Sequence, residues 1–340
     1  MSEARTILIT GVAGLLGSHA ADKFIAEGWK VVGIDNLVGG YKDNVPAKVE
    51  LHVADCCDFP TIEKIMNQVR PEIVLHTACT AYEGLSVFSP SLVFDNTASA
   101  TISVASAAIA AGVKRFIQCS SMARYGDHDG QEFTEDMETR PQDPYGIAKV
   151  AAEDVLWNLA AVHGIEVVVL VPHNIIGSRQ KYDDPFRNVA AIMINRMLKG
   201  LQPVIYGDGL QTRSFSFVGD VVNPIWIAAT SDAVVGEVIN VGPDKNSITI
   251  TQLAEEIAGL LDFNLDPIFV ADRPQEVKHA SCSADKARKL LNYSAQIDLR
   301  TGLNEMISYI KEKGPKEFAY DHRLEIVSEK TPKTWVNRII

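Results

Sequence analysis

The sequence predicts an α/β fold in which a Rossmann-type, doubly wound parallel sheet is joined to a smaller C-terminal α/β lobe. Short apolar strands alternate with helical segments from the first residues onward. Strands that are apolar along their whole length and separated by helices are typical of a parallel sheet that helices cover on both faces. A glycine-rich turn at the first strand-to-helix junction indicates the same fold class.

The alternation of strand and helix runs through the first half of the chain. Apolar strands are expected at residues 6–9, 30–35, 49–55, 73–76, 115–120 and 166–171, and helices at 18–27 and 91–111. From about residue 175 the rhythm breaks into loops and shorter elements. We therefore expect a Rossmann domain over 1–174 to which later segments return, a second lobe over 175–313 and an extension over 314–340. The extension either packs over the second lobe or a partner subunit, or is a frayed terminus.

The composition excludes several classes of partner. The chain has 340 residues, 46% of them hydrophobic, and a net charge of −11. It can therefore bury a large core and has no general affinity for nucleic acid or an anionic membrane. Its five cysteines form no Cys-x-x-Cys step and no metal-ligand spacing, which predicts a reducing compartment and no metal site. With no signal-peptide pattern and no apolar run near the roughly 20 residues of a membrane helix, we expect a soluble cytoplasmic protein.

A glycine-rich segment, Thr10-Gly11-Val12-Ala13-Gly14-Leu15-Leu16-Gly17-Ser18, lies between the first strand and the first helix. Glycines here allow a tight turn and a close backbone approach, so that free N–H groups and the helix N-terminus face a pyrophosphate. The Gly-x-x-Gly-x-x-Gly spacing departs from the Gly-x-Gly-x-x-Gly rule, and an ordinary strand-to-helix turn is the alternative. Its place at the first junction favours dinucleotide binding by Gly11, Gly14, Leu15, Leu16 and Gly17.

Acidic residues end the next two strands. Asp35, followed by Asn36, ends the second strand, where a carboxylate accepts hydrogen bonds from a ribose diol and repels a 2′-phosphate. This position favours NAD over NADP as the cofactor, with a solvated turn residue as the alternative. Asp55 ends the third strand and either contacts the adenine or caps the strand. Ala78, after the fourth strand, is expected in the same cofactor site.

A Tyr-x-x-x-Lys step, from Tyr145 to Lys149, opens an alanine-rich stretch that is expected to be helical. Residues four apart share a helix face, so the Lys149 ammonium can lie beside the Tyr145 phenol. A nearby cation favours phenolate and lowers the tyrosine pKa from about 10 toward neutral pH. The pair thus predicts a general base suited to a sugar hydroxyl, although the same step is common on solvated helices.

These and further motifs follow one another in a defined order. They are Thr10-Gly11-x-x-Gly14-x-x-Gly17, Cys119-Ser120-Ser121-Met122-Ala123-Arg124-Tyr125-Gly126, Tyr145-x-x-x-Lys149, Val171-Pro172-His173-Asn174 and Tyr206-Gly207-Asp208-Gly209-Leu210-Gln211-Thr212-Arg213. Over residues 6 to about 293 the chain resembles the extended short-chain dehydrogenases/reductases of the NAD-dependent nucleotide-sugar epimerase and dehydratase family. The resemblance implies that Tyr145 is the base, that Lys149 binds the nicotinamide ribose and acidifies Tyr145, and that Ser121 hydrogen-bonds the reacting hydroxyl.

The residues after Ser121 narrow the reaction. In dehydratases of this family an acidic pair follows the catalytic hydroxyl, and the related decarboxylases also place a Glu here. Met122 and Ala123 stand at these positions and can neither donate nor accept a proton. What remains is oxidation at a hydroxyl carbon and re-reduction, as in a UDP-glucose or UDP-GlcNAc 4-epimerase. Glu83, in a loop after the fourth strand, is either a surface carboxylate or an extra acid or base that faces the sugar.

The later motifs predict how a nucleotide sugar binds. Guanidinium forks match phosphate oxygens, so Arg213 and Arg273 are candidates to clamp the diphosphate, with surface ion pairs as the alternative. By the resemblance, the other contacts are Asn174 and Asn188 near the phosphates, Tyr206 on the base and Glu276 on the nucleotide ribose. Ala280, where some hexose-only relatives carry a large residue, leaves room for an N-acetyl group. His173 and Arg124 depart from the family pattern and are expected near the cleft, which leaves the sugar and the nucleotide open.

The family resemblance also implies a homodimer. It would be built from the 91–111 helix and the helix after Tyr145, whose alanine-rich surfaces suit a close four-helix seam. Two other functions stay open. One is another NAD-dependent nucleotide-sugar oxidoreductase or epimerase, acting at a different carbon or on a GDP, CDP or dTDP sugar. The other is a non-catalytic dinucleotide sensor, which the intact set of Ser121, Tyr145 and Lys149 argues against.

Overall fold

The computed structural model describes residues 4–245, 247–275 and 277–340. The strands of its central sheet are β1 (Thr6–Thr10), β2 (Lys30–Asp35), β3 (Glu50–Val53), β4 (Ile73–His76), β5 (Arg115–Cys119), β6 (Glu166–Pro172) and β11 (Val238–Val241). All seven are parallel and follow the order β11-β6-β5-β4-β1-β2-β3. This order contains the 3-2-1-4-5-6 arrangement of a Rossmann sheet. The predicted fold class is confirmed.

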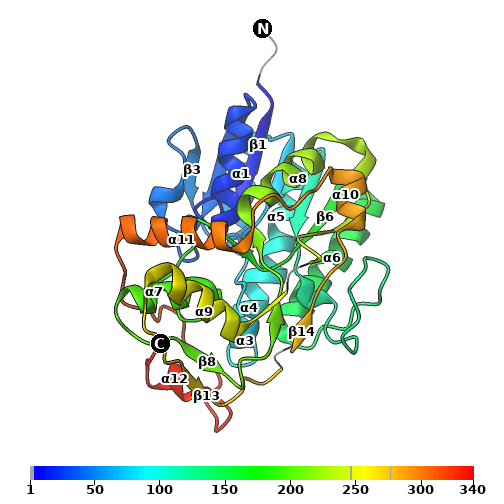
Figure 1. The fold of residues 1–340 in the computed structure, drawn as a ribbon. Coiled ribbons are helices and arrows are strands. Elements are labelled where there is room, and N and C mark those ends of the chain that lie inside the picture. Colours follow the sequence, from blue (N-terminus) through cyan, green and yellow to red (C-terminus); the bar gives the residue numbers. More distant parts are fainter. Residues whose placement is uncertain (1–3, 246, 276) are drawn as a thin grey trace.

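Helices cover both faces of the sheet (Figure 1). They are α1 (Leu15–Ala26), α2 (Phe59–Val69), α5 (Ala100–Ala110), α6 (Pro144–His163), α8 (Val218–Thr230) and α10 (Asp285–Leu291). Successive residues of a strand point to opposite faces, so Ile7 and Ile9 of β1 enter the core under α1 and α8, whereas Leu8 enters the core under α2 and α5. The strands must therefore be apolar throughout, as the sequence shows.

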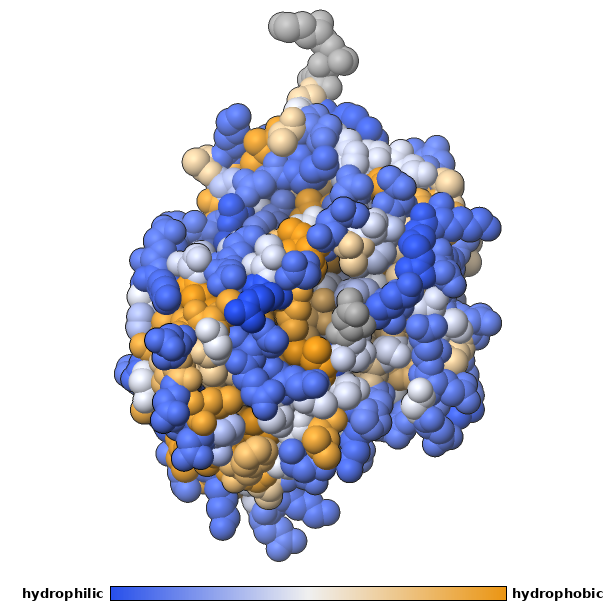
Figure 2. Space-filling model, in the orientation of Figure 1, coloured by the Kyte–Doolittle hydropathy of each residue, from blue (hydrophilic) through white to orange (hydrophobic). Residues whose placement is uncertain are grey.

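The second lobe lies below the central sheet in Figure 1. Its elements are β7 (Ile175–Ile176), α7 (Val189–Leu198), β8 (Val204–Tyr206), β9 (Thr212–Arg213), β10 (Ser216–Phe217), β12 (Ile248–Thr249), α9 (Ile250–Leu261), β13 (Ile268–Val270), β14 (His279–Ala280) and α11 (Leu299–Lys313). The helices α7, α9 and α11 share a hydrophobic core of their own. Hydrophobic residues also gather on the surface over α7 and α9, while the rim of this face is hydrophilic (Figure 2). The chain returns from this lobe to the sheet, where β11 pairs with β6.

Local sequence signals fix where α6 begins and ends. The side chain of Asp143 accepts a hydrogen bond of 2.9 Å from the backbone N–H of Gly146, and Pro144 occupies the first helical position. Both are strong N-terminal signals, because the first N–H groups of a helix lack partners within it. The helix ends at Gly164, whose φ of 74° lies in the left-handed region. This capped start places Tyr145 at the end of the helix that meets the sheet's carboxyl edge.

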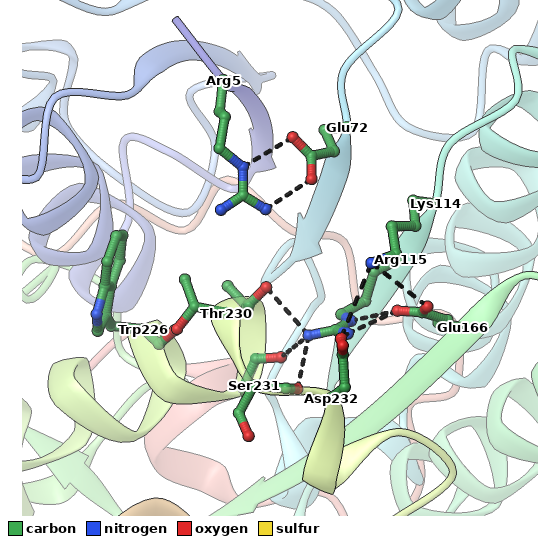
Figure 3. A network of polar contacts seen from close by, with 11 residues as sticks. Arg5, Glu72, Lys114, Arg115, Glu166, Trp226, Thr230, Ser231 and Asp232 are labelled. Atoms are coloured by element: carbon green, nitrogen blue, oxygen red, sulfur yellow. Dashed lines mark hydrogen bonds and ion pairs between the residues drawn. The ribbon is translucent and has the colours of Figure 1, made fainter.

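A buried arginine holds the opposite, amino-terminal edge of the sheet together (Figure 3). Arg115, the first residue of β5, is 2% exposed and pairs at 2.6 Å with both Glu166 and Asp232. Its Nη1 donates to three carbonyl oxygens at the end of α8, those of Ala228, Ala229 and Ser231, at 2.8–3.1 Å. Carbonyls at a helix C-terminus lack intrahelical partners, so Arg115 both caps α8 and joins it to β5 and β6.

The expectation that no apolar run approaches the length of a membrane helix is wrong, because one helix among the described residues meets the length and composition of a membrane span. It runs over Pro90–Ala110 as α4 (Pro90–Phe94), a π-helical turn (Asp95–Ser99) and α5. More than half of it is buried inside the protein, and α5 packs against α2 and α6. Burial of this kind is typical of a core helix of a globular fold.

Residues 314–340 are packed against the rest of the chain. They include the short helix α12 (Lys333–Val336), whose Trp335 is 3% exposed. The segment contacts the second lobe, since the backbone N–H of Ala319 donates to Asp183 O at 2.8 Å. It also contacts the first half of the chain, where Ser89 Oγ donates to Arg323 O at 3.0 Å. Of the alternatives left by the sequence, packing over the second lobe is the one observed.

Candidate active site

A cleft of about 670 Å³ lies between the carboxyl ends of the parallel strands and the second lobe. Ligands of open α/β sheets bind at this edge, where the strand order reverses, and the volume is in the range of small-molecule sites. Most of the site residues predicted from the sequence line this cleft. They are Gly11, Gly14, Leu15, Leu16, Gly17, Asp35, Asn36, Asp55, Ala78, Glu83, Ser121, Tyr145, Lys149, Asn174, Asn188, Tyr206, Arg213 and Arg273. Ala280 lines a smaller cavity next to it, and Glu276 lies outside the described residues.

The glycine loop is as tight as its spacing predicts. Gly11 has a φ of 72°, and a Cβ at Gly17 would lie 2.2 Å from Gly11 O. A side chain at either position would force the loop open. The backbone N–H of Gly14 donates to Gly11 O at 3.0 Å, which holds the loop against the start of α1. This arrangement leaves a helix N-terminus facing the cleft and fits the pyrophosphate of a dinucleotide.

Asp35 joins this loop to the second strand. Its carboxylate accepts hydrogen bonds from the backbone N–H groups of Ala13 at 2.9 Å and Leu37 at 2.7 Å. Burial raises the pKa of Asp35, and the two N–H donors lower it again. A carboxylate at this point of the cleft fits the adenosine ribose of NAD. Asp55 lines the cleft and also accepts from Cys57 N at 2.8 Å, so it caps the end of its strand as well.

The predicted Ser–Tyr–Lys set meets at the centre of the cleft. The Nζ of Lys149 lies 5.7 Å from the centre of the Tyr145 ring and donates to Cys119 O at 2.7 Å. Ser121 is hydrogen-bonded to the Tyr145 phenol. Burial nevertheless raises the pKa of Tyr145 well above its usual 10, and the acidic neighbours Cys79 and Glu83 raise it further. The expectation that the pKa of Tyr145 lies below its usual value is therefore wrong for the protein chain on its own.

Glu83 faces the reacting centre. It is the first residue of α3 (Glu83–Ser86), which follows β4, and it lines both the main cleft and the smaller cavity. Its charge is near enough to Tyr145 to raise the pKa of the phenol. Glu83 is thus an exposed carboxylate at the cleft, and its role as an extra acid or base stays a prediction.

The residues predicted to bind the nucleotide sugar line the far side of the cleft. Arg273 lies over the Tyr206 ring at 4.7 Å, and the Tyr206 hydroxyl is 2.7 Å from Thr334 Oγ1. One face of this tyrosine is thus covered by a guanidinium. Asn188 accepts from the N–H of Ala190 at 2.9 Å and so caps α7. Asn174 Nδ2 donates to Ser214 O at 3.0 Å, and Arg213 Nη1 donates to Thr212 O at 2.8 Å.

His173 and Arg124 do not reach the cleft, although the sequence suggested that both lie near it. Arg124 forms a buried ion pair of 2.8 Å with Glu153 of α6. His173 is buried beside Gly242, whose Cβ position would be 2.6 Å from His173 Nδ1. Neither belongs to the described lining, so these departures from the family pattern carry no information about the sugar.

Sequence analysis missed two cations that line the cleft, Lys181 and Arg187. Arg187 lies 4.9 Å over the Tyr82 ring and pairs with Asp184 at 3.3 Å. The Tyr82 hydroxyl donates to the same carboxylate. The sequence signal that could have identified Arg187 is its position next to Asn188, which was a predicted site residue. Among the described residues, no group of three or more His, Cys, Asp or Glu side chains is placed to hold a metal ion.

The order of the sheet, the glycine turn and the tyrosine–lysine helix at one cleft define a dinucleotide-dependent enzyme of the extended short-chain dehydrogenase/reductase type. Within this class, the chain belongs to the NAD dependent epimerase/dehydratase family, whose sequence model matches residues 7–242.

Named relatives agree with this assignment. A UDP-glucose 4-epimerase of Mycolicibacterium smegmatis is 31% identical over 316 residues, which cover 90% of this chain and 98% of the relative. The crystal structure of the UDP-glucose 4-epimerase of Thermotoga maritima with UDP-glucose has a TM-score of 0.86 at 30% identity, covering 91% of this chain and 99% of that one. The UDP-N-acetylglucosamine 4-epimerase of Methanobrevibacter ruminantium, in complex with UDP-N-acetylmuramic acid, has a TM-score of 0.83 at 29% identity, with coverage of 92% and 99%.

Proposed function

We propose that this protein is an NAD-dependent nucleotide-sugar epimerase that inverts C4 of a UDP-hexose or a UDP-N-acetylhexosamine. The observation that carries the proposal is the meeting of Ser121, Tyr145 and Lys149 in one cleft beside two residues, Met122 and Ala123, that cannot transfer protons. The relatives named above are UDP-sugar 4-epimerases, which supports the same activity.

NAD, which the glycine loop and Asp35 would hold, would supply a hydride acceptor that returns the hydride within the same turnover. Tyr145 would take the proton of the C4 hydroxyl when this carbon is oxidised, and would give the proton back when the 4-keto sugar is reduced on its other face. Ser121, hydrogen-bonded to the phenol, orients the reacting hydroxyl. Lys149 is held by Cys119 O and stabilises the negative charge that Tyr145 carries before it accepts the proton.

The far side of the cleft would hold the nucleotide diphosphate. Arg213 and Arg273 can grip phosphate oxygens, with Asn174 and Asn188 beside them. Tyr206 would stack on the base through the face that Arg273 does not cover. Glu276 would hold the nucleotide ribose, as its family position implies.

Space beside Ala280 supports an N-acetylated sugar as a second substrate. This residue lines a cavity of about 30 Å³ together with Met122, Asn174 and Arg213, all of which also line the main cleft. The cavity therefore adjoins the cleft at the sugar end. A large side chain in place of Ala280 would fill the space that an acetyl group needs.

We also propose a homodimer in the cytoplasm. The helix over Pro90–Ala110 is apolar and not fully buried, and Ile147 of α6 is 47% exposed. Pairing these helices with those of a second subunit would cover both surfaces. All five cysteines are free, which fits a reducing compartment.

The activity can be tested with a panel of UDP-, GDP-, CDP- and dTDP-sugars followed by proton NMR. We expect interconversion of one pair of C4 epimers without added NAD, and no conversion by Tyr145→Phe. Net formation of NADH would instead identify a one-way oxidoreductase. Loss of water to a 4-keto-6-deoxy sugar would identify a dehydratase. Tight NAD binding without any turnover would identify a sensor.

A further inference from the structure

The segment 314–340 runs from the second lobe to the first half of the chain. On the lobe, Lys316 N donates to Asn195 Oδ1 at 3.0 Å, and Arg196 Nη1 donates to Ile339 O at 2.9 Å. The Tyr206 ring lies edge-on to Trp335, with 6.4 Å between their centres. The segment is therefore anchored on both α7 and the strand that carries Tyr206.

Its middle part is bonded to the turn between α3 and α4. The backbone N–H groups of Glu325 and Ile326 both donate to Phe88 O, at 3.0 and 2.9 Å. The Glu325 carboxylate accepts hydrogen bonds from the N–H groups of Ser91 at 3.0 Å and Leu92 at 2.8 Å. These belong to the first turn of the long helix that starts at Pro90.

Such a bond pattern is a helix cap supplied from a distant part of the sequence. The first N–H groups of a helix have no partner within it, and a negative charge there is favoured by the helix dipole. The local residue Ser89 provides no side-chain cap; its hydroxyl donates instead to Arg323 O. The start of this helix thus depends on Glu325, more than 230 positions further along the chain.

The capped turn adjoins one wall of the cleft, which residues 80–84 just before the turn and Leu92 at the start of the long helix line. It follows α3, whose Glu83 faces Tyr145, and Tyr82 just before it also lines the cleft. The Tyr82 hydroxyl lies 3.2 Å from Nε2 of His322, which belongs to the same C-terminal segment and lines the cleft as well. The segment therefore links this wall to the second lobe, beside the direct hydrogen bond from Tyr82 to Asp184.

We propose that the 314–340 segment ties the two lobes together at the sugar end of the cleft, and that Glu325 is a positioning residue for substrate binding. It acts through the α3–α4 turn and not by touching the sugar. The inference rests on the proposed function, because it assigns to this wall a role in holding the sugar nucleotide. Loosening the wall lowers the fraction of molecules that are ready to bind, which raises KM, whereas the proton and hydride transfers at Tyr145 are unchanged.

The test compares Glu325→Ala with Glu325→Gln and with Glu329→Ala in the full-length protein. The Ala variant removes the cap, and the Gln variant keeps one carbonyl oxygen as an acceptor. Glu329 is exposed in the same segment and serves as the control. Amide hydrogen exchange over residues 88–95 reports the turn, and steady-state kinetics with UDP-glucose report binding and turnover separately.

For Glu325→Ala we expect faster exchange over 88–95 and a KM about five- to tenfold higher, as loss of an N-cap implies, with kcat within about twofold of the wild type. Glu325→Gln should recover part of both effects, and Glu329→Ala should match the wild type. Faster exchange with an unchanged KM would overturn the proposal, because the tie would then be structural only. Unchanged exchange would overturn it as well. A wild-type protein that neither binds nor converts UDP-sugars would contradict the proposed function itself, while the exchange data would still report whether the cap exists.

Discussion

Lys149 lies over the Tyr145 ring, 5.7 Å from its centre, with its ammonium held at 2.7 Å by the carbonyl oxygen of Cys119. The backbone at the end of β5 therefore fixes the cation, and helix geometry alone fixes the spacing of the pair. The proton affinity of Tyr145 depends on more than this neighbour. Burial and the acidic neighbours Cys79 and Glu83 raise its pKa, so the groups around the pair also affect how readily Tyr145 loses its proton.

The first prediction concerns the Glu83 charge. In Glu83→Gln the negative charge that raises the Tyr145 pKa is gone, so more phenolate is present at a given pH. The value of kcat/KM should rise with pH as Tyr145 ionises, and in this variant the rise should occur at lower pH. A series of kcat/KM measurements with UDP-glucose at different pH values tests this. Glu329→Gln, which removes an exposed charge in the C-terminal segment, should leave the profile in place. An unshifted profile in Glu83→Gln would show that this carboxylate does not act on the base.

The second prediction concerns the choice of sugar. Ala280→Tyr fills the cavity beside the sugar end of the cleft, so turnover of UDP-GlcNAc should fall by at least about tenfold relative to UDP-glucose, the loss expected when a group no longer fits its pocket. Ala280→Gly keeps the space open and is the matched control. The ratio of the two kcat/KM values is the measurement. An equal loss for both sugars would mean that Ala280 does not select between them.

The third prediction concerns stability in acid. Burial lowers the pKa of His173 to about 3, whereas an unfolded histidine titrates near about 6.5. Between these values the unfolded chain binds a proton that the folded chain does not, so the free energy of unfolding falls as the pH drops below about 6.5. In His173→Phe this loss should be smaller by up to about 1.4 kcal/mol per pH unit.

Urea unfolding at pH 7.0, 5.5 and 4.5 measures this slope. His76 is buried with its pKa likewise lowered to about 3, so part of the acid sensitivity should remain in His173→Phe. A variant with the same slope as the wild type would contradict the assignment of a neutral, buried His173. Neither ring nitrogen of His173 has a hydrogen-bond partner among the described residues, so the substitution by phenylalanine removes no hydrogen bond to them.

The fourth prediction concerns the amino-terminal edge of the sheet. Arg115→Met leaves the carbonyls at the end of α8 and the acids Glu166 and Asp232 without their shared donor. The free energy of unfolding should fall by about 2–3 kcal/mol, below the full loss for a buried pair because Asp232 is largely exposed. Arg5→Met breaks the exposed pair with Glu72 in the same region and should lose about 1 kcal/mol or less.

Arg115 is the first residue of β5 and Arg5 directly precedes β1, so both lie at the edge of the sheet opposite the cleft (Figure 3). Denaturant unfolding gives the stability, and the KM for UDP-glucose checks that the site is intact. Equal losses in the two variants would show that burial of the Arg115 network adds nothing beyond a surface ion pair.

The strands and the cofactor loop were predictable because their signals are local. Apolar runs, glycine spacing and the acidic residue at the end of β2 each reflect a backbone or packing need of the segment itself. The strand predicted at 166–171 is observed at Glu166–Pro172. The strand β11 was not predicted, since its four residues include a buried polar one, Asn240, which is bonded to Tyr125 and to Phe133 O.

The directions of single side chains and the role of the last residues were not predictable in the same way. Arg124 turns away from the cleft because a buried carboxylate, Glu153, lies two turns into α6, and sequence spacing between different elements does not reveal such a partner. The cap that Glu325 provides joins residues more than 230 apart. The pKa of Tyr145 depends on burial, which only the packed fold defines.

The late position of β11 has a consequence for how the protein is made. When the ribosome has released residues 166–172, the apolar strand β6 has an open edge, and its partner at 238–241 has not yet been synthesised. An unpaired apolar edge is a template for aggregation. A fragment that stops near residue 174 should therefore be insoluble, and a dissection of this enzyme into parts must carry residues 218–241 along with the first half.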